Sequence, residues 1–258
     1  MSVVDAISTD EVVGRAEPVN SKAHAYAEVR KAIMEGRLAP GEVVSQVQLA
    51  AELDISRTPL REALRQLQSE GLLDGDFNRR IRVAPLTVED LEQIAAMRIA
   101  LETFGVQSTV PLLTKHDLEA LRNAFARMDD ALKPGDLALD EHRIHHRIFH
   151  TTLFSRVGGR MRTQLTDLWD NAERYRVFYR QSAQNQFAVA CTAQDEHANI
   201  LEAAEQGQAQ RCGHLIAEHL GRTALTSLAK LAPAHDPWIV RDAIRFATGV
   251  GVPDSRRK

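Results

Sequence analysis

The helical spacing of the apolar residues from Val88 to Ala232 limits the fold of this chain more than any other feature. No segment in this range shows the alternation of apolar and polar residues that is typical of a half-buried strand. Proline and glycine breakers divide it into six predicted helices, at about 88–107, 115–133, 138–156, 160–182, 188–206 and 208–231. Helices of this kind bury their apolar faces against one another, which predicts an all-α antiparallel bundle over residues 88–232. The extension 233–258 is expected to add one helix or to form a disordered end.

Residues 22–87 show a different order of elements. A helical pattern from His24 to Glu35 stops at Gly36, and Ser45 can cap a second helix, QVQLAAEL. The segment ISRTPLREALRQLQSEG predicts a third helix, and LLDGDFNRRIRVAP predicts a two-stranded hairpin. This is the element order of a winged helix-turn-helix domain. The fold class is therefore mainly α, with a small β-hairpin, and residues 1–21 are expected to form a disordered tail.

The composition places the chain among ordinary globular proteins. Its 258 residues, 44% hydrophobic and 26% charged, fit one large domain or two smaller ones. Cys191 and Cys212 are too few for a disulfide framework, and no CxxC pair indicates a zinc finger. The N-terminus lacks the pattern of a signal peptide, and no apolar run is long enough to span a membrane. We therefore expect a cytoplasmic protein without a membrane segment.

The third predicted helix carries two distinct faces. At about 100° per residue, its leucines fall on one stripe, and a row of arginines is centred roughly 110° away from that stripe. The leucine stripe is Leu60, Ala63, Leu64 and Leu67, and the row is Arg57, Arg61 and Arg65. Arginines beside a packing face suit the major groove of DNA, where they bind guanine or phosphate. A solvated helix face is the alternative for the row alone.

The surrounding residues favour DNA even though the chain has a net charge of −3. Residues 22–87 carry ten Lys and Arg against nine Asp and Glu, so the position of the charges matters more than their sum. The predicted hairpin supplies a second basic element where a wing would contact the DNA backbone or minor groove. Its polar and basic residues are Asn78, Arg79, Arg80 and Arg82.

The helical region contains a group of histidines. His146 and His150, within DEHRIHHRIFH, are four residues apart and share a helix face, so they can bind one metal ion or serve a structural purpose. His197 and His219 lie on the last two predicted helices, 188–206 and 208–231.

A charged pair interrupts an apolar stripe of the first helix of the bundle. Arg98 and Glu102 fall among Leu91, Ile94, Ala95 and Leu101, and a charge inside a packing face needs a partner. The pair can be internal, or Arg98 can bind the carboxylate of a small molecule.

Two spans resemble one known family. The stretch EGRLAPGEVVSQVQLAAELDISRTPLREALRQLQSEGLL resembles the N-terminal domain of GntR-type bacterial transcription regulators. The helical region that follows resembles the FCD ligand-binding domain of the FadR subfamily, so the resemblance covers about residues 22–232. It implies that Arg57, Thr58 and Arg61 contact bases and adjacent phosphates, with Ser56 and Arg65 at phosphates. After Asn78 and Arg79, this chain has Arg80 where the family usually has glycine.

The same resemblance implies a metal and an effector. It places His150, His197 and His219 on the family's three histidine positions and His146 on its aspartate position. A neutral, all-histidine set favours zinc, with nickel possible, over magnesium or calcium. By the same resemblance, Arg98 beside Glu102 binds the carboxylate of an organic-acid effector that also reaches the metal. Asn171 and Tyr175 are further candidates for the lining of that pocket.

These features predict a homodimeric regulator, acting as a repressor on palindromic double-stranded operator DNA. The alternative, from another class of function, is that the protein is a helical metal-dependent enzyme that uses the histidines. No histidine follows a glutamate by three residues, and the sequence has neither an HExxH motif nor a glycine-rich phosphate loop. The prediction is therefore that the protein is not an enzyme. An adaptor that uses its winged domain to bind protein would leave the arginine row unexplained.

Overall fold

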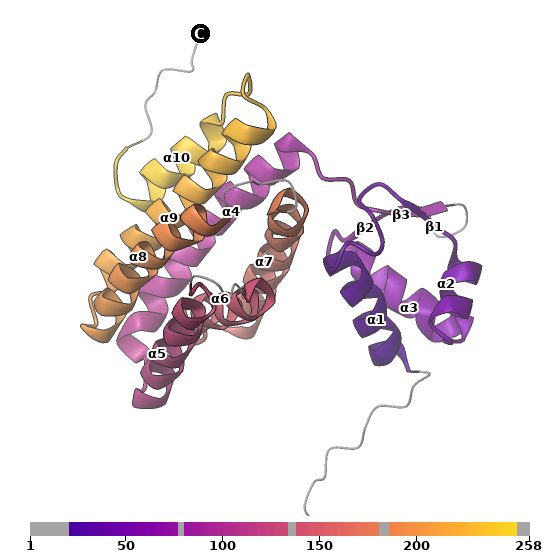
Figure 1. The fold of residues 1–258 in the computed structure, drawn as a ribbon, viewed down its shortest axis with the longest axis horizontal. Coiled ribbons are helices and arrows are strands. Elements are labelled where there is room, and N and C mark those ends of the chain that lie inside the picture. Colours follow the sequence, from indigo (N-terminus) through magenta and orange to yellow (C-terminus); the bar gives the residue numbers. More distant parts are fainter. Residues whose placement is uncertain (1–20, 77–79, 134–137, 181–185, 252–258) are drawn as a thin grey trace, which may run out of the picture.

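The computed structural model describes residues 21–76, 80–133, 138–180 and 186–251. They form a small N-terminal domain with a sheet and a larger helical domain (Figure 1). The class is mainly α with a small sheet, as predicted. None of the helices among these residues is long and apolar enough to cross a membrane.

The N-terminal domain is built on three short helices and three strands. Ser21 and Ser45 cap the first two helices, because their side chains accept hydrogen bonds from the backbone amides of His24 and Gln48. The elements are α1 (Lys22–Met34), β1 (Val43–Val44), α2 (Gln46–Glu52), α3 (Arg57–Ser69), β2 (Leu73–Asp76) and β3 (Arg80–Val83). The predicted helices and hairpin are confirmed.

Strand β1 was not predicted. The sheet has the order β1-β3-β2, and Val43 and Val44 pair antiparallel with Arg82 and Ile81. Two residues are too short for an alternating pattern to be read from sequence. The strand forms because Val44 is buried in the domain core beside Ile81.

The helical domain contains the six predicted helices. They are α4 (Val88–Thr109), α5 (Lys115–Asp130), α6 (Leu139–Leu153), α7 (Gly159–Arg180), α8 (Gln186–Glu205) and α9 (Ala209–Leu231), with a 3-10 turn η1 (Val110–Leu112) after α4. Thr114 and Asp117 form a reciprocal capping box that begins α5. Helices α4 and α9 contact one another extensively, and one core joins the helices.

The C-terminal extension adds a helix, α10 (Trp238–Ala247), which packs against α4 and α9. Its Val240 is fully buried in the core of the helical domain. Glu92 of α4 accepts hydrogen bonds from the backbone amide of Ile239 and from His235, both at 2.8 Å. Gly221 of α9 permits this packing, because a Cβ there would lie 2.4 Å from Cδ1 of Ile244. Of the two outcomes considered for this segment, the structure has the helix.

Candidate DNA interface and metal centre

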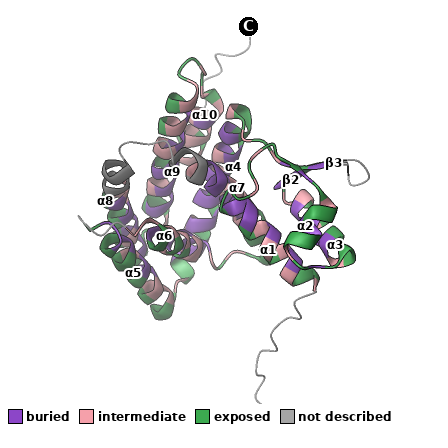
Figure 2. Cartoon of the chain, turned by 45° about the vertical axis from the view of Figure 1, so that its right-hand side comes forward, coloured by how far each residue is buried: buried purple, intermediate pink, exposed green. Residues whose placement is uncertain are grey.

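Helix α3 presents the two faces that its sequence predicts. Its stripe of Leu60, Ala63, Leu64 and Leu67 is completely buried in the core of the N-terminal domain. This packing fixes the rotation of the helix, and exposed residues follow its other side (Figure 2). The exposed residues include all five candidates for DNA contacts on this helix: Ser56, Arg57, Thr58, Arg61 and Arg65.

The predicted wing is described only in part. Asn78 and Arg79 lie outside the described residues, and so does the side chain of Arg80. Arg82 on β3 is half exposed and forms an ion pair of 3.3 Å with Asp74 on β2.

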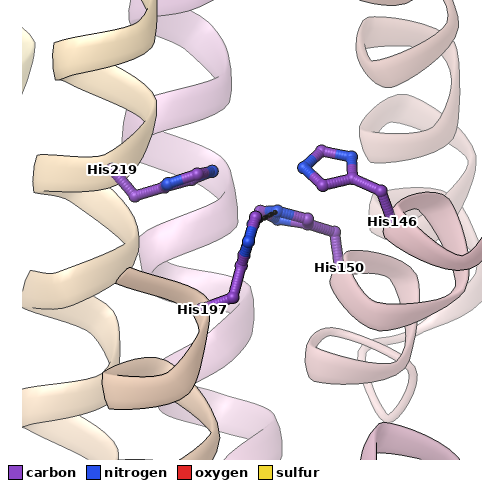
Figure 3. Close-up of side chains that lie close together, drawn as sticks. All are labelled: His146, His150, His197 and His219. Carbon is purple, nitrogen blue, oxygen red and sulfur yellow. Dashed lines mark hydrogen bonds between the residues drawn. The ribbon is translucent and has the colours of Figure 1, made fainter. Parts of the chain in front are cut away.

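Three helices bring the four candidate histidines together. His146 and His150 come from α6, His197 from α8 and His219 from α9, and their side chains converge (Figure 3). All four are buried, and one ring nitrogen from each lies within 4.8 Å of the others. Nε2 of His150 and Nε2 of His197 are 3.2 Å apart.

The donor set fits a zinc ion. Zn–N bonds of about 2.0–2.1 Å place tetrahedral ligand nitrogens roughly 3.3 Å apart, so small side-chain rotations would close the wider distances. His197 Nδ1 is buried, and among the described residues it has no hydrogen-bond partner. Four neutral imidazoles without a carboxylate ligand suit zinc better than magnesium or calcium.

Burial keeps these histidines neutral. It lowers the pKa of His150 to about 4, although the nearby Glu102 opposes the shift. Burial also lowers the pKa of His146 and His197 well below the ordinary value, and it lowers that of His219. Neutral rings at pH 7 leave a nitrogen lone pair available to a metal without the loss of a proton.

One carboxylate orients a candidate ligand. Nδ1 of His219 lies 2.7 Å from Oε2 of Glu196, which also accepts a hydrogen bond from Arg222. Burial alone would raise the pKa of Glu196, but the hydrogen bonds from His219 and Arg222 lower it to about 2. The ionised Glu196 fixes the proton on Nδ1 and turns Nε2 toward the cluster. No spacing rule identifies Glu196 from sequence, because the two residues lie on different helices.

His146 has a different partner. Nη1 of Arg176 lies 2.9 Å from its Nδ1, and Arg176 also pairs with Glu173 at 3.2 Å. Because a guanidinium can only donate, Nδ1 of His146 must accept this bond, and the ring proton then sits on Nε2. His146 can therefore bind a metal through Nε2 only after Arg176 releases Nδ1. The sequence patterns did not identify Arg176.

Arg98 and Glu102 lie beside the histidines. Nε of Arg98 donates to Oε1 of Glu102 at 2.6 Å, and Oε2 of Glu102 is 3.8 Å from Nδ1 of His150. The Arg98 guanidinium lies 4.4 Å from the centre of the Trp169 ring. Its Nη2 is buried and, within the described part of the chain, has no hydrogen-bond partner. The internal pair is thus present, and Arg98 still has a donor for a ligand.

The structure does not place Asn171 and Tyr175 with this group. Nδ2 of Asn171 donates to the backbone carbonyl of Glu70, and the Tyr175 hydroxyl accepts from the amide of Thr87 and donates to Asp90. Both side chains therefore bind near the junction of the two domains, so their assignment to the pocket is corrected. Besides Arg176, α7 brings Trp169 to the histidines, and its ring centre is 5.3 Å from those of His146 and His150.

Comparison with known families gives two adjoining matches. Residues 21–83 match the family described as bacterial regulatory proteins, gntR family, and residues 93–222 match the FCD domain. The chain belongs to the GntR family. Helix α10 of this GntR-family protein lies beyond the FCD match.

Among its relatives is the probable D-xylose utilization operon transcriptional repressor of Paenarthrobacter nicotinovorans. The two are 29% identical over 192 residues, which cover 73% of this chain and 80% of that protein. The HTH-type regulator YdhC of Bacillus subtilis (strain 168) is 30% identical over 128 residues, but these span 50% of this chain and only 57% of that protein.

A solved structure shares the fold. E. coli McbR/YncC superposes with a TM-score of 0.71 at 22% sequence identity, covering 83% of this chain and 99% of that one. At this identity the likeness establishes the two-domain fold of the GntR-family protein and nothing finer.

Proposed function

We propose that this GntR-family protein is a transcription repressor that binds operator DNA through α3. The observation that carries this proposal is the exposed Arg57 and Arg61 on a helix whose leucine stripe is completely buried. A rigidly packed helix can present guanidinium groups to base edges at a fixed depth, as direct readout requires.

We further propose that His146, His150, His197 and His219 hold a divalent metal ion, with zinc favoured. The convergence of four buried donors and the carboxylate on His219 support this role. His150, His197 and His219 supply the stronger ligands, since Arg176 competes for His146. The group serves as a sensor in this proposal and not as a catalytic centre.

The charges around the cluster favour an anionic effector. Each arginine near it is paired with a carboxylate: Arg98 with Glu102, Arg176 with Glu173, and Arg222 with Glu196. These pairs nearly cancel, so a bound divalent ion would leave the buried site positively charged. An organic acid can offset that charge with a carboxylate and accept a hydrogen bond from Nη2 of Arg98.

A homodimer is part of the proposal. Met97 and Phe104 lie seven residues apart on one face of α4, and 46% and 56% of their surfaces are exposed. Large apolar side chains at this spacing are suited to a contact between copies of the chain. A two-fold dimer would present two α3 helices to a palindromic site.

The test begins with DNA selected by the purified protein from a random pool. We expect palindromic sequences, bound by the wild-type protein and not by Arg57→Ala, with Arg122→Ala as a control for an exposed arginine on α5. Selection of no shared sequence would contradict the proposal.

For the effector, thermal unfolding with a panel of mono-, di- and hydroxycarboxylic acids is measured with zinc and with chelator, because a ligand of the folded state raises the unfolding temperature. An acid that acts equally with chelator would argue against the metal-linked site.

A further inference from the structure

Helix α7 contacts the DNA-binding domain at several points. It lies on the side of the helical domain that faces the N-terminal domain (Figure 1), and it contacts α1. Arg174 donates a hydrogen bond to the backbone carbonyl of Ala84, just after β3. Asn171 donates at 2.9 Å to the carbonyl of Glu70, the residue that caps the C-terminus of α3. The end of the proposed recognition helix is therefore held by α7.

The same segment of α7 contacts the histidine site. The buried Trp169 lies against His146, His150 and the guanidinium of Arg98. Two turns further along, Arg176 is bound to Nδ1 of His146. A change in the positions of the histidines must therefore be accommodated by side chains of α7, because interiors are packed too closely to absorb it locally.

Asp170 joins these two sets of contacts. It follows Trp169, and its buried carboxylate accepts hydrogen bonds from Arg30 of α1 and Arg147 of α6. Arg147 is the residue after His146, so one carboxylate is shared by the DNA-binding domain and by the helix that carries two candidate ligands. A cavity of about 490 Å³ adjoins these three side chains and gives the arginines room to move.

We propose that Asp170 is the residue through which the histidine site controls the position of the DNA-binding domain. The inference rests on the proposed function. When His146 and His150 close on a shared ion, the turn of α6 that carries Arg147 shifts and Trp169 moves with the rings. The Asp170 carboxylate then binds one of the two arginines, Arg147 or Arg30, more strongly and the other more weakly. This change alters how firmly α1 is held against α7. Thermodynamic linkage requires the reverse as well, so operator binding changes metal affinity by the same factor.

The test compares operator affinity of the full-length protein with zinc bound and with chelator, using the selected DNA and fluorescence anisotropy. For the wild type we expect the two dissociation constants to differ by about fivefold or more, the usual range of allosteric coupling. Asp170→Asn should reduce this ratio to about one, while zinc still binds and the chelated protein still binds DNA. Asp167→Asn, three residues earlier on α7 in the same cavity, removes the same charge and should keep the wild-type ratio. Arg30→Gln breaks the contact from the α1 side and should also abolish the ratio.

Each result bears on a separate claim. If the wild-type protein does not bind zinc, or does not bind DNA, the result would contradict the proposed function. A wild-type ratio of one with both ligands binding, or an unchanged ratio in Asp170→Asn and Arg30→Gln, would overturn the role of Asp170 and leave the DNA-binding proposal intact. If Asp167→Asn reduces the ratio of dissociation constants as much as Asp170→Asn does, the role of Asp170 would also be overturned. The loss of a negative charge anywhere in this region would then explain both results. If Asp170→Asn does not fold, as judged by circular dichroism, Arg30→Gln decides alone.

Discussion

The proposed DNA-binding face and the histidine site differ in how their side chains are positioned and in how far they are exposed. On α3 the side chains proposed to contact DNA are exposed and the buried leucines only set their direction, whereas the four histidines are buried and come from three helices. An exposed row can be lost one residue at a time with little effect on the fold. The arrangement of the four histidines depends on the packing of the whole bundle. Their chemistry depends on the charged side chains beside them, which act strongly because water is excluded from the site.

Removal of a histidine ligand is expected to have the largest effect. His197→Ala should lower zinc affinity by well over 100-fold, beyond the roughly 10–100-fold that typically follows loss of a residue that only orients a ligand. Competition with a chromogenic chelator measures this affinity. His146→Ala should cost clearly less, because Arg176 already occupies Nδ1 of His146. Equal losses in the two variants would contradict the assigned order of ligand strength.

Loss of an α3 arginine comes next. Arg61→Ala should weaken operator binding by about 10–100-fold, corresponding to about 1–3 kcal/mol for a base contact. The unfolding temperature should stay close to that of the wild type, because Arg61 is exposed. Anisotropy titrations and thermal unfolding measure the two quantities. A variant that loses DNA binding only by unfolding would remove the distinction between the exposed face and the buried site.

The orienting carboxylate should have a smaller effect than a ligand. Glu196→Gln should lower zinc affinity by about tenfold, because the neutral amide holds His219 less firmly than a carboxylate does. Chelator competition again reports the change, and Glu202→Gln on the exposed side of α8 is the matched control. A loss in Glu202→Gln of the same size would show that the charge on the helix matters and the contact to His219 does not.

The smallest expected effect is the pH dependence of the metal-free protein. The pKa of His150 is about 4 in the folded state and about 6.5 in an unfolded chain, so the unfolded chain takes up protons first as pH falls. The free energy of unfolding should therefore be largest above about pH 6.5 and should decrease toward pH 4. Urea unfolding at pH 7.5 and 5.5 measures the difference. It should be smaller in His150→Gln and unchanged in His116→Gln, which alters an exposed histidine.

The two regions also differ in how far they can be predicted from sequence. The direction of Arg57 and Arg61 follows from the spacing of Leu60, Leu64 and Leu67, because a helix of known period fixes the angle between two stripes. The convergence of His197 and His219 with the α6 pair came instead from the family resemblance, because it depends on how distant helices pack.

The contacts that surround the histidines escaped sequence reasoning. Glu196, Arg176 and Trp169 follow no local pattern, since their role depends on which residues of other helices face them. Asn171 and Tyr175 were misplaced for the same reason, because a position on α7 does not specify which face of that helix meets the histidines. The strand Val43–Val44 was missed because two residues carry no period.

The central claim is that the occupied histidine site controls the affinity of the exposed face for DNA. Its most direct test is a titration of the selected DNA with zinc-loaded protein, with and without the organic acid that raises the unfolding temperature. The acid should change the operator dissociation constant of the wild type by about fivefold or more and leave that of His197→Ala unchanged. An equal response in both proteins, or no response in the wild type, would contradict the claim.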